Sequence, residues 1–197
     1  MKTQHPTVGI PVRSLPDLLA PKLEVVFVGI NPSLYSVERG HYFARATNRF
    51  WTALSHSKLS ARARRALKVD LLRPEHDVEL PRFGIGFTDV IKRPTVNVSQ
   101  LGPGEFEEAV PLLLAKLQQF APRVACFHGL TGYRPFQRIA LGSAALPALG
   151  PQPERIGTTR IFVVPNPSGA NAHFTRADQA AWYDRLAEFV AAIKSGD

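Results

Sequence analysis

Three short and continuous apolar runs constrain what this chain can fold into. They are LEVVFVGI at 23–30, RVACFH at 123–128 and RIFVVP at 160–165, and FGIGFTDV at 83–90 is a weaker fourth. Apolar runs of this length without polar alternation are typical of strands that are covered on both faces, as in parallel sheets. Helical patterns lie between the runs, so the sequence predicts an α/β protein. We expect a three-layer α/β/α sandwich around a central, mainly parallel four-stranded sheet.

Two of the predicted helices have clear sequence signals. Residues 105–120 form an apolar-rich helical pattern that Pro111 should kink. Near the C-terminus, Thr175 and Asp178 resemble a capping box, with Asp in place of the usual Glu or Gln. The helix that follows them presents apolar residues on one face, namely Trp182, Leu186, Phe189, Val190 and Ile193.

Length and charge bound the class of protein. The 197 residues predict a single domain, residues 1–197, whose proline-punctuated extension, residues 1–21, wraps the core. The net charge of +8 favours a polyanionic partner, nucleic acid first and an acidic membrane second, although many basic proteins bind neither. We expect no membrane span and no signal peptide, because no apolar run reaches about 18 residues. A cytoplasmic protein follows from this.

Cysteine and histidine usage predicts no metal and no cofactor. Cys126 is the only cysteine, which excludes an intrachain disulfide and a self-contained four-cysteine site. No Cys/His cluster has metal-ligand spacing, and the chain has no nucleotide-binding or nucleophile-elbow motif. His128, at the end of a predicted strand, is interpreted as a satisfied core residue.

Polar loops follow two of the predicted strands. They read GINPS at 29–33 and PNPSG at 165–169. For either loop alone a strand-ending turn is the plainer interpretation, since Asn and Pro are both turn residues. Ligands in parallel sheets bind beyond the C-terminal strand ends, so two such loops favour a shared crevice. The first loop continues into GHYF, whose rings can stack on a planar ligand, although Phe43 taken alone is more often a core residue.

These motifs resemble those of one enzyme family. The matching segments are GINP at 29–32, GHYF at 40–43, NRFW at 48–51, KRPT at 92–95, LGPQP at 149–153 and NPSG at 166–169. In this order they resemble the mismatch-specific uracil/thymine DNA glycosylases, the Mug/TDG branch of the uracil-DNA glycosylase superfamily. The likeness extends from about residue 15 to about residue 190.

The resemblance implies an activity and a partner. A monofunctional DNA glycosylase of this kind flips uracil out of double-stranded DNA, preferably from G·U mismatches, and leaves an abasic site in base excision repair. We therefore expect double-stranded DNA containing uracil or abasic sites as the partner. A monomer in the bacterial cytoplasm, active at the nucleoid, is the expected form.

The resemblance also assigns roles to individual residues. Asn31 matches the catalytic asparagine, which holds a water beneath the sugar C1′. An amide cannot take the proton, so the uracil anion must be stabilised as it leaves, by backbone N–H groups near Ile30 and Phe43. Phe43 matches the ring that stacks on the flipped base. Asn166 matches the second catalytic position and can donate a hydrogen bond to uracil, and Ser168 is expected to contact the substrate.

One position departs from the family pattern. The family usually has glycine where this chain has Ser33, facing the 5-position of the pyrimidine. The serine side chain occupies space that the thymine methyl needs. We therefore predict that uracil is accepted and thymine is disfavoured, by roughly 1–3 kcal/mol for a group of this size.

The segment after the second motif is predicted to contact DNA. It comprises Gly169, Ala170, Asn171, His173 and Arg176. The family uses Leu or Arg here to fill the space that the flipped nucleotide leaves. Ala170 is too small for this, so Asn171 or His173 is expected to reach the unpaired guanine. Residues 58–73 carry six basic groups, which are either phosphate contacts or an ordinary solvated helix face.

Two alternatives belong to other classes. The small residue at 170 and the lack of a catalytic Asp are also typical of a protein that binds abasic or mismatched sites with little turnover. An unrelated α/β hydrolase would use Ser33 or Ser168 as its nucleophile, but the sequence offers no obvious base for either hydroxyl.

Overall fold

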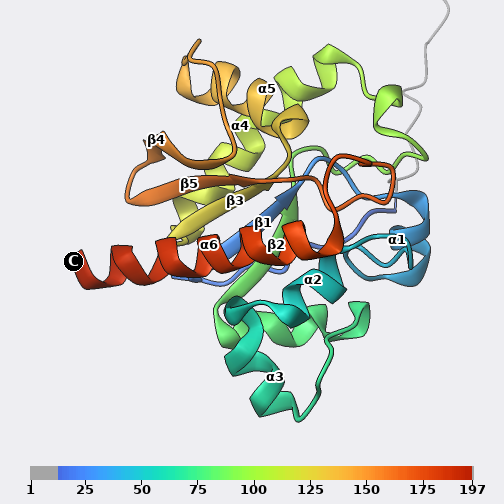
Figure 1. The fold of residues 1–197 in the computed structure, drawn as a ribbon. Coiled ribbons are helices and arrows are strands. Elements are labelled where there is room, and N and C mark those ends of the chain that lie inside the picture. The colour runs from blue at the N-terminus through green and yellow to red at the C-terminus, as the bar shows by residue number, and fades with distance from the viewer. Residues whose placement is uncertain (1–12, 197) are drawn as a thin grey trace, which may run out of the picture.

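The structure is a computed structural model that describes residues 13–196, and it has helical layers on both faces of one sheet (Figure 1). The strands are β1 (Val25–Gly29), β2 (Ile85–Asp89), β3 (Val124–His128), β4 (Gly150–Ile156) and β5 (Thr159–Val164). The α-helices are α1 (Leu34–Arg39), α2 (Phe50–His56), α3 (Ala61–Leu67), α4 (Pro103–Phe120), α5 (Leu130–Leu141) and α6 (Arg176–Gly196). Three 3-10 segments complete it, at Lys58–Ser60, Pro74–Phe83 and Val98–Gln100.

The sheet has the strand order β2-β1-β3-β5-β4. The pairs β1–β2, β1–β3 and β3–β5 are parallel, which confirms the predicted α/β sandwich. The predicted number of four strands was one too low, because β4 adds an antiparallel edge strand beside β5. Sequence patterns did not indicate β4, because Pro151 and Pro153 lie within it, only its two end residues are buried, and its register shifts between Pro151 and Arg155. Prolines and irregular register are tolerated at sheet edges, where half of the backbone groups face solvent.

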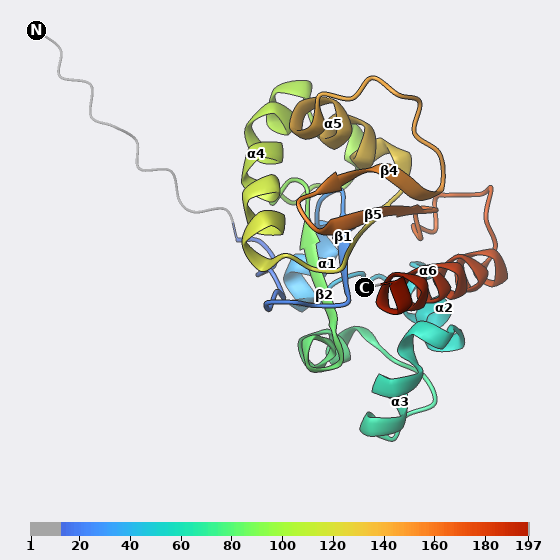
Figure 2. The ribbon, with the colours of Figure 1, turned by 90° about the vertical axis from the view of Figure 1, so that its left-hand side faces the viewer.

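Two apolar cores lie on opposite faces of the sheet. On one face, alternate residues of the strands pack against α2 and α6, as Phe27 and Phe87 do with Leu54 and Leu186. On the other face, strand residues such as Val28 pack against α4 and α5. Figure 2 shows α4 and α5 on one side of the sheet and α2, α3 and α6 on the other. The strands are buried on both faces, which explains why they read as unbroken apolar runs.

The chain before β1 runs along the outer edge of the sheet. Leu18 pairs with Phe87 through two backbone hydrogen bonds of 2.9 and 3.0 Å, and Leu15 is buried. Residues 13–21 of the predicted wrapping extension therefore lie against β2. Residues 1–12 of that extension lie outside the described residues.

Helix boundaries follow local chemistry. Thr175 and Asp178 form the predicted reciprocal cap: the Thr175 amide donates to the Asp178 carboxylate at 2.8 Å, and the Asp178 amide donates to the Thr175 hydroxyl at 3.1 Å. The helix predicted over 105–120 begins two residues earlier, at Pro103, and α4 continues through Pro111.

Within residues 13–196, no helix is long and apolar enough to cross a membrane, and no three His, Cys, Asp or Glu side chains form a group that could hold a metal ion.

Candidate active site at the C-terminal strand ends

Asn31 lies directly beyond β1, and its side-chain amide is held at both hydrogens. Its Nδ2 donates to the carbonyl of Arg93 at 2.9 Å and to the hydroxyl of Thr95 at 2.8 Å. Both partners belong to the KRPT segment that follows β2, the strand next to β1. Among the described residues no donor contacts the Asn31 Oδ1. The amide is thus oriented with its acceptor available to a ligand or a water.

Ser33 serves first as a helix cap. Its hydroxyl accepts a hydrogen bond from the Ser36 amide and donates to the Ser36 hydroxyl, both at 3.1 Å. Ser33 is therefore the N-cap of α1, and the chain around it pairs with Thr95. Ile30, the residue before Asn31, is buried between this loop and the first turn of α5. The Ser33 hydroxyl contacts no histidine within residues 13–196, which leaves the hydrolase alternative without a base at this position.

Phe43 occupies an unusual backbone conformation. Its φ is +53°, a left-handed value that a bulky side chain rarely adopts and that costs of order 1–3 kcal/mol. The ring stacks on Phe50 at a centroid distance of 4.3 Å and contacts the edge of His128 at 5.1 Å. It remains partly exposed. The contacts with Phe50 and His128 hold this ring at the top of the core, beside the strand ends.

A buried carboxylate holds the GHYF loop in this strained form. Asp77 is 1% exposed and comes from the 3-10 segment at 74–83. It accepts from the Tyr42 amide at 2.8 Å and lies 3.0 Å from the His41 Nδ1. On the other side of Phe43, the Ala44 amide donates to the Ser36 hydroxyl at 3.3 Å. Asp77 could not be identified from the sequence, because nothing in the local pattern at 74–83 indicates which residues Asp77 contacts.

The second loop, after β5, presents another oriented amide. The Oδ1 of Asn166 accepts from the Ser168 amide at 3.0 Å, which closes a tight turn. Its Nδ2 donates to no described residue, so the hydrogen-bond donor of Asn166 is the available group. The Ser168 hydroxyl accepts from the Ala170 amide at 3.4 Å and has no histidine beside it in the described chain.

Arg49 joins the two loops. Its amide donates to the Pro167 carbonyl at 2.9 Å, and its guanidinium donates to the carbonyls of Ser168 and Asn171 at 3.2 and 2.7 Å. Beside it, a Cβ at Gly169 would lie only 2.8 Å from the Thr47 carbonyl, so glycine is required there. The NRFW motif therefore forms the support of the second loop. The sequence showed this motif but gave Arg49 no role.

The start of α5 brings the two amide loops together. A Cβ at Gly132 would lie 3.0 Å from Ile30, and one at Gly129 would lie 3.1 Å from the Asn166 Cβ. The first turn of α5 thus lies between the residues that precede Asn31 and Asn166 itself. With Phe43 against His128 at the end of β3, the predicted residues Ile30, Asn31, Phe43 and Asn166 surround neighbouring strand ends.

His128 is buried beneath these strand ends. Its Nε2 lies 3.0 Å from the Tyr183 hydroxyl, while its Nδ1 has no partner in the described chain. The interpretation as a satisfied core residue is therefore right for one ring nitrogen only. Burial lowers the pKa of His128 to about 3, so the ring is neutral at physiological pH.

The residues predicted to contact DNA are not equally available. Gly169, Ala170, His173 and Arg176 are exposed. Asn171 is held inside its own loop: its Nδ2 donates to the Asn166 carbonyl at 2.9 Å and its Oδ1 accepts from the His173 amide at 3.3 Å. For Asn171 to reach an unpaired guanine, these contacts must break.

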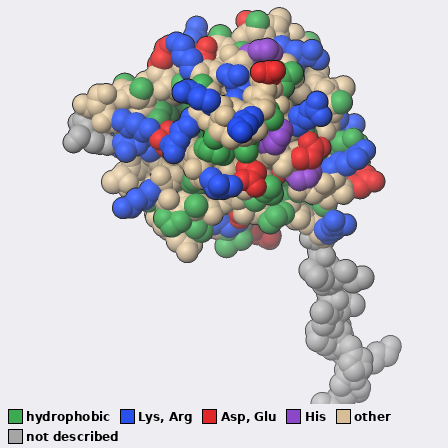
Figure 3. Space-filling view, turned by 90° about the horizontal axis from the view of Figure 1, so that it is seen from below, with side chains coloured by type: hydrophobic (Ala, Val, Ile, Leu, Met, Phe, Trp, Pro, Cys, Tyr) green, Lys and Arg blue, Asp and Glu red, His purple; other side chains and the backbone are tan. Residues whose placement is uncertain are grey.

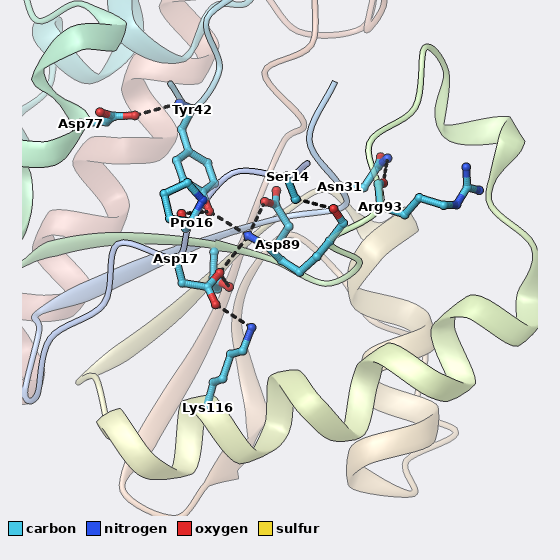
Figure 4. A network of polar contacts seen from close by, with 11 residues as sticks. Ser14, Pro16, Asp17, Asn31, Tyr42, Asp77, Asp89, Arg93 and Lys116 are labelled. Atoms are coloured by element: carbon cyan, nitrogen blue, oxygen red, sulfur yellow. Dashed lines mark hydrogen bonds and ion pairs between the residues drawn. The ribbon is translucent and has the colours of Figure 1, made fainter. Parts of the chain in front are cut away.

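A partly buried ionic network, in which only Asp89 is fully buried, lies on the other side of the first loop (Figure 4). Lys92 lies 2.9 Å from Asp17 and 3.3 Å from Asp89, and Lys116 lies 2.6 Å from Asp17. Burial, which outweighs the opposing effect of Lys92, raises the pKa of Asp89 to about 6. Burial acts in the same direction on Asp17, but Lys92, Lys116 and Thr88 outweigh it and lower that pKa. A Cβ at Gly29 would lie 2.5 Å from the Asp89 Oδ1, so the glycine before Ile30 makes room for this carboxylate.

The basic stretch at 58–73 lies around α3, away from the candidate active site at the C-terminal strand ends. Figure 3 views the molecule from this side and shows Lys and Arg side chains dispersed among acidic ones. Lys58 pairs with Glu188 at 3.0 Å, and the Arg64 Nε donates to the Ser60 hydroxyl at 3.2 Å. Dispersed charge of this kind is typical of a solvated surface.

Comparison with known proteins agrees with the fold and with the position of the motifs. The family model of the uracil DNA glycosylase superfamily matches residues 16–191. The chain is also similar to a candidate uracil DNA glycosylase from Methanosarcina acetivorans whose structure was determined in solution by NMR. The two share 23% sequence identity with a TM-score of 0.54, over 89% of this chain and 98% of that one, which is a likeness of fold. The match over residues 16–191 includes both amide loops and the aromatic segment between them, and on that ground the chain belongs to the uracil DNA glycosylase superfamily of DNA-repair hydrolases.

Proposed function

We propose that this protein is a monofunctional glycosylase of the Mug/TDG type, which flips uracil out of double-stranded DNA, preferably from G·U pairs. The observation that carries the proposal is the Asn31 amide, whose two hydrogens are held by Arg93 and Thr95 and whose Oδ1 is left as an acceptor. An acceptor fixed in this way can hold one water in a defined place. The superfamily assignment indicates the bond that is hydrolysed, the one between base and deoxyribose.

Asn31 positions the water but does not activate it strongly. An amide oxygen accepts a hydrogen bond and takes no proton at neutral pH. The bond to the base therefore breaks first, its electron pair leaves with the uracil anion, and the sugar develops oxocarbenium character. The positioned water then adds to C1′, and its proton goes to the departed uracil anion or to solvent. Rate acceleration comes from positioning and from stabilisation of the departing uracil anion.

The chain offers neutral donors to that anion. The free Nδ2 of Asn166 donates from one side, and the first turn of α5 places the positive end of its helix dipole between Ile30 and Asn166. His128 is neutral at physiological pH and adds no charge. Stabilisation by neutral donors predicts slower turnover than in glycosylases that have histidine at the second motif.

Phe43 supplies a platform for the extruded base. Phe50 covers one face of the Phe43 ring, and the contact with His128 holds the ring in one orientation before any ligand binds. Base–aromatic stacking contributes about 1–3 kcal/mol and tolerates any base. Selection of uracil therefore depends on Asn166 and on the space around Ser33.

The direct test is single-turnover cleavage of duplexes that carry G·U, A·U, G·T or a G·abasic pair, with the protein in excess. The proposal predicts alkali-labile product first from G·U, less from A·U and little from G·T. A protein that yields no product from any duplex contradicts it.

A second function is favoured by the loop after Gly169. Ala170 is small and the Asn171 side chain is engaged within the loop, so of the residues predicted to fill the space of a flipped nucleotide only His173 is exposed. A protein of this fold that binds abasic or mismatched sites and turns over weakly fits this feature. In the same panel it would retain the G·abasic duplex tightly in a binding assay while releasing no uracil.

A further inference from the structure

A hollow of about 840 Å³ lies at the edge of the sheet where the parallel strands begin. It is bordered by the residues before β3, the β4–β5 turn and the last turns of α6. Figure 1 shows that turn and the end of α6 on the left, and the loop between β5 and α6 on the right. Because five or six residues of strand separate the two edges, the hollow lies roughly 15–20 Å from the candidate active site.

Among the residues that the structure describes, the charged ones that line this hollow are all basic. They are Lys22, Arg123, Arg155 and Arg160. Arg155 and Arg160 are direct partners in the antiparallel β4–β5 ladder, where like charges destabilise a sheet. The Arg160 amide donates to the Arg123 carbonyl at 2.9 Å, so a third basic residue lies beside them. Within residues 13–196, no carboxylate contacts the side chains of Lys22, Arg155 or Arg160.

Helix ends account for only part of this charge. The C-terminal ends of α4, capped by Ala121, and of α6 both border the hollow. Each helix C-terminus carries about half a negative charge, so the two together offset about one cation. Lys22, Arg155 and Arg160 carry three positive charges and have no carboxylate partner among the described residues. About two of these charges are therefore left uncompensated.

The residues around the hollow also suit a particular ligand chemistry. The fork of donors on a guanidinium matches two oxygens of a phosphate group, and Arg155 and Arg160 present two such forks side by side in the hollow. The helical side presents apolar surface from Phe189 and Ile193. We propose that this hollow binds a ligand with at least two phosphate groups, either a nucleoside polyphosphate or the backbone of a DNA strand outside the candidate active site.

Isothermal titration of the full chain with inorganic tripolyphosphate at low salt tests the proposal. We expect saturable binding of one equivalent. The double variant Arg155→Gln/Arg160→Gln should bind at least tenfold more weakly, and Lys22→Gln measurably more weakly. The matched control is Arg62→Gln/Arg65→Gln, which removes two exposed charges from α3 and should bind within twofold of the wild type. Absence of saturable binding, or an equal loss in the control variant, overturns the proposal.

Melting temperatures keep the test valid if a variant is less stable. Without ligand, Arg155→Gln/Arg160→Gln should melt no lower than the wild type, because a like-charged pair has been removed. Tripolyphosphate should raise the melting temperature of the wild type and leave that of the double variant unchanged. Equal shifts in both proteins would place the binding elsewhere and contradict the assignment.

Competition identifies the source of the phosphates. Displacement of tripolyphosphate by ATP indicates a free nucleotide, and displacement only by a uracil-free single-stranded oligonucleotide indicates a second DNA segment. Failure of both to displace it means that the hollow accepts neither a nucleotide nor a DNA backbone, which overturns the proposal. Excision of uracil from a short duplex should be the same in the double variant and the wild type, so a failure of the glycosylase proposal is seen in a separate assay.

Discussion

Two amides of opposite orientation define the chemistry at the scale of the residue. Asn31 is anchored through its hydrogens and leaves an acceptor, whereas Asn166 is anchored through its oxygen and leaves a donor. The same side-chain type can therefore serve a water on one side of a glycosidic bond and a leaving base on the other. The difference arises from the neighbouring backbone, which no single-residue pattern reveals.

Ser33→Gly tests whether this side chain excludes thymine. Gly at an N-cap costs only a few tenths of a kcal/mol, so α1 should remain intact. Release of thymine from G·T duplexes should rise about tenfold or more, as expected for the removal of one obstructing group, while uracil release changes little. Ser33→Ala is the matched control, because it loses the cap but keeps the Cβ. Unchanged thymine release in Ser33→Gly would show that Ser33 is not the gate.

Phe43→Leu tests the stacking platform. Leucine keeps apolar contact with Phe50 and loses the flat surface, so uracil excision under single turnover should fall about tenfold or more, in line with the stacking energy of one base. Phe43→Tyr retains the ring and should keep most of the activity. If the leucine variant works as well as the tyrosine variant, the ring does not support the base.

At the scale of elements, the site depends on segments that are distant in sequence but share one edge of the sheet. Arg49 before α2 holds the loop between β5 and α6, and Asp77 from the 3-10 segment holds the loop before Phe43. These contacts join residues 35 to 122 positions apart. A DNA-contacting loop that is braced by another element is preorganised for binding, which reduces the cost of ordering it.

Arg49→Lys tests the brace. An ammonium on a flexible chain lacks the rigid fork and does not hold both carbonyls in the same geometry. We expect binding to a G·abasic duplex to weaken about tenfold, because each hydrogen bond from a charged donor contributes about 1.5–3 kcal/mol. Arg62→Lys on α3 is the control and should bind like the wild type. Equal affinity of the two variants for this duplex would show that Arg49 does not brace the loop between β5 and α6.

The apolar strands were predictable and the supports of the site were not. The runs ending at residues 30, 128 and 165 predicted buried parallel strands, and the polar loops beyond two of them predicted where the site lies. β4 escaped because Pro151 and Pro153 oppose a strand assignment that only an edge position permits. The roles of Asp77 and Asp89 depend on which distant groups they meet in the fold, and local periodicity contains no such information.

At the scale of the whole molecule, the ionic network around Asp89 makes stability depend on pH. Asp89 is 4% exposed, and burial raises its pKa to about 6 despite the nearby Lys92. A raised pKa means that the folded protein binds this proton more tightly than the unfolded chain does. Its contribution to stability is therefore complete below pH 3.8 and is lost as the pH rises through about 6.

Asp89→Asn should reveal this contribution in denaturant unfolding between pH 4 and pH 7. The free energy of unfolding of the variant, minus that of the wild type, should increase with pH by up to about 3 kcal/mol. Asp17, whose pKa is lowered, acts in the opposite direction. Because Asp17 and Asp89 share Lys92, its contribution is removed by comparing Asp17→Asn with the double variant Asp17→Asn/Asp89→Asn. A difference that stays flat or falls with pH contradicts the role of Asp89.

The proposed mechanism depends on the anchored amide of Asn31. The contribution of this amide to the rate is measured directly by comparing wild type and Asn31→Ala in single-turnover release of uracil from a G·U duplex. With the water no longer positioned, we predict a rate at least about 10²-fold lower, while affinity for a G·abasic duplex and the melting temperature stay close to those of the wild type. Uracil release at the wild-type rate by a folded Asn31→Ala protein would contradict the mechanism.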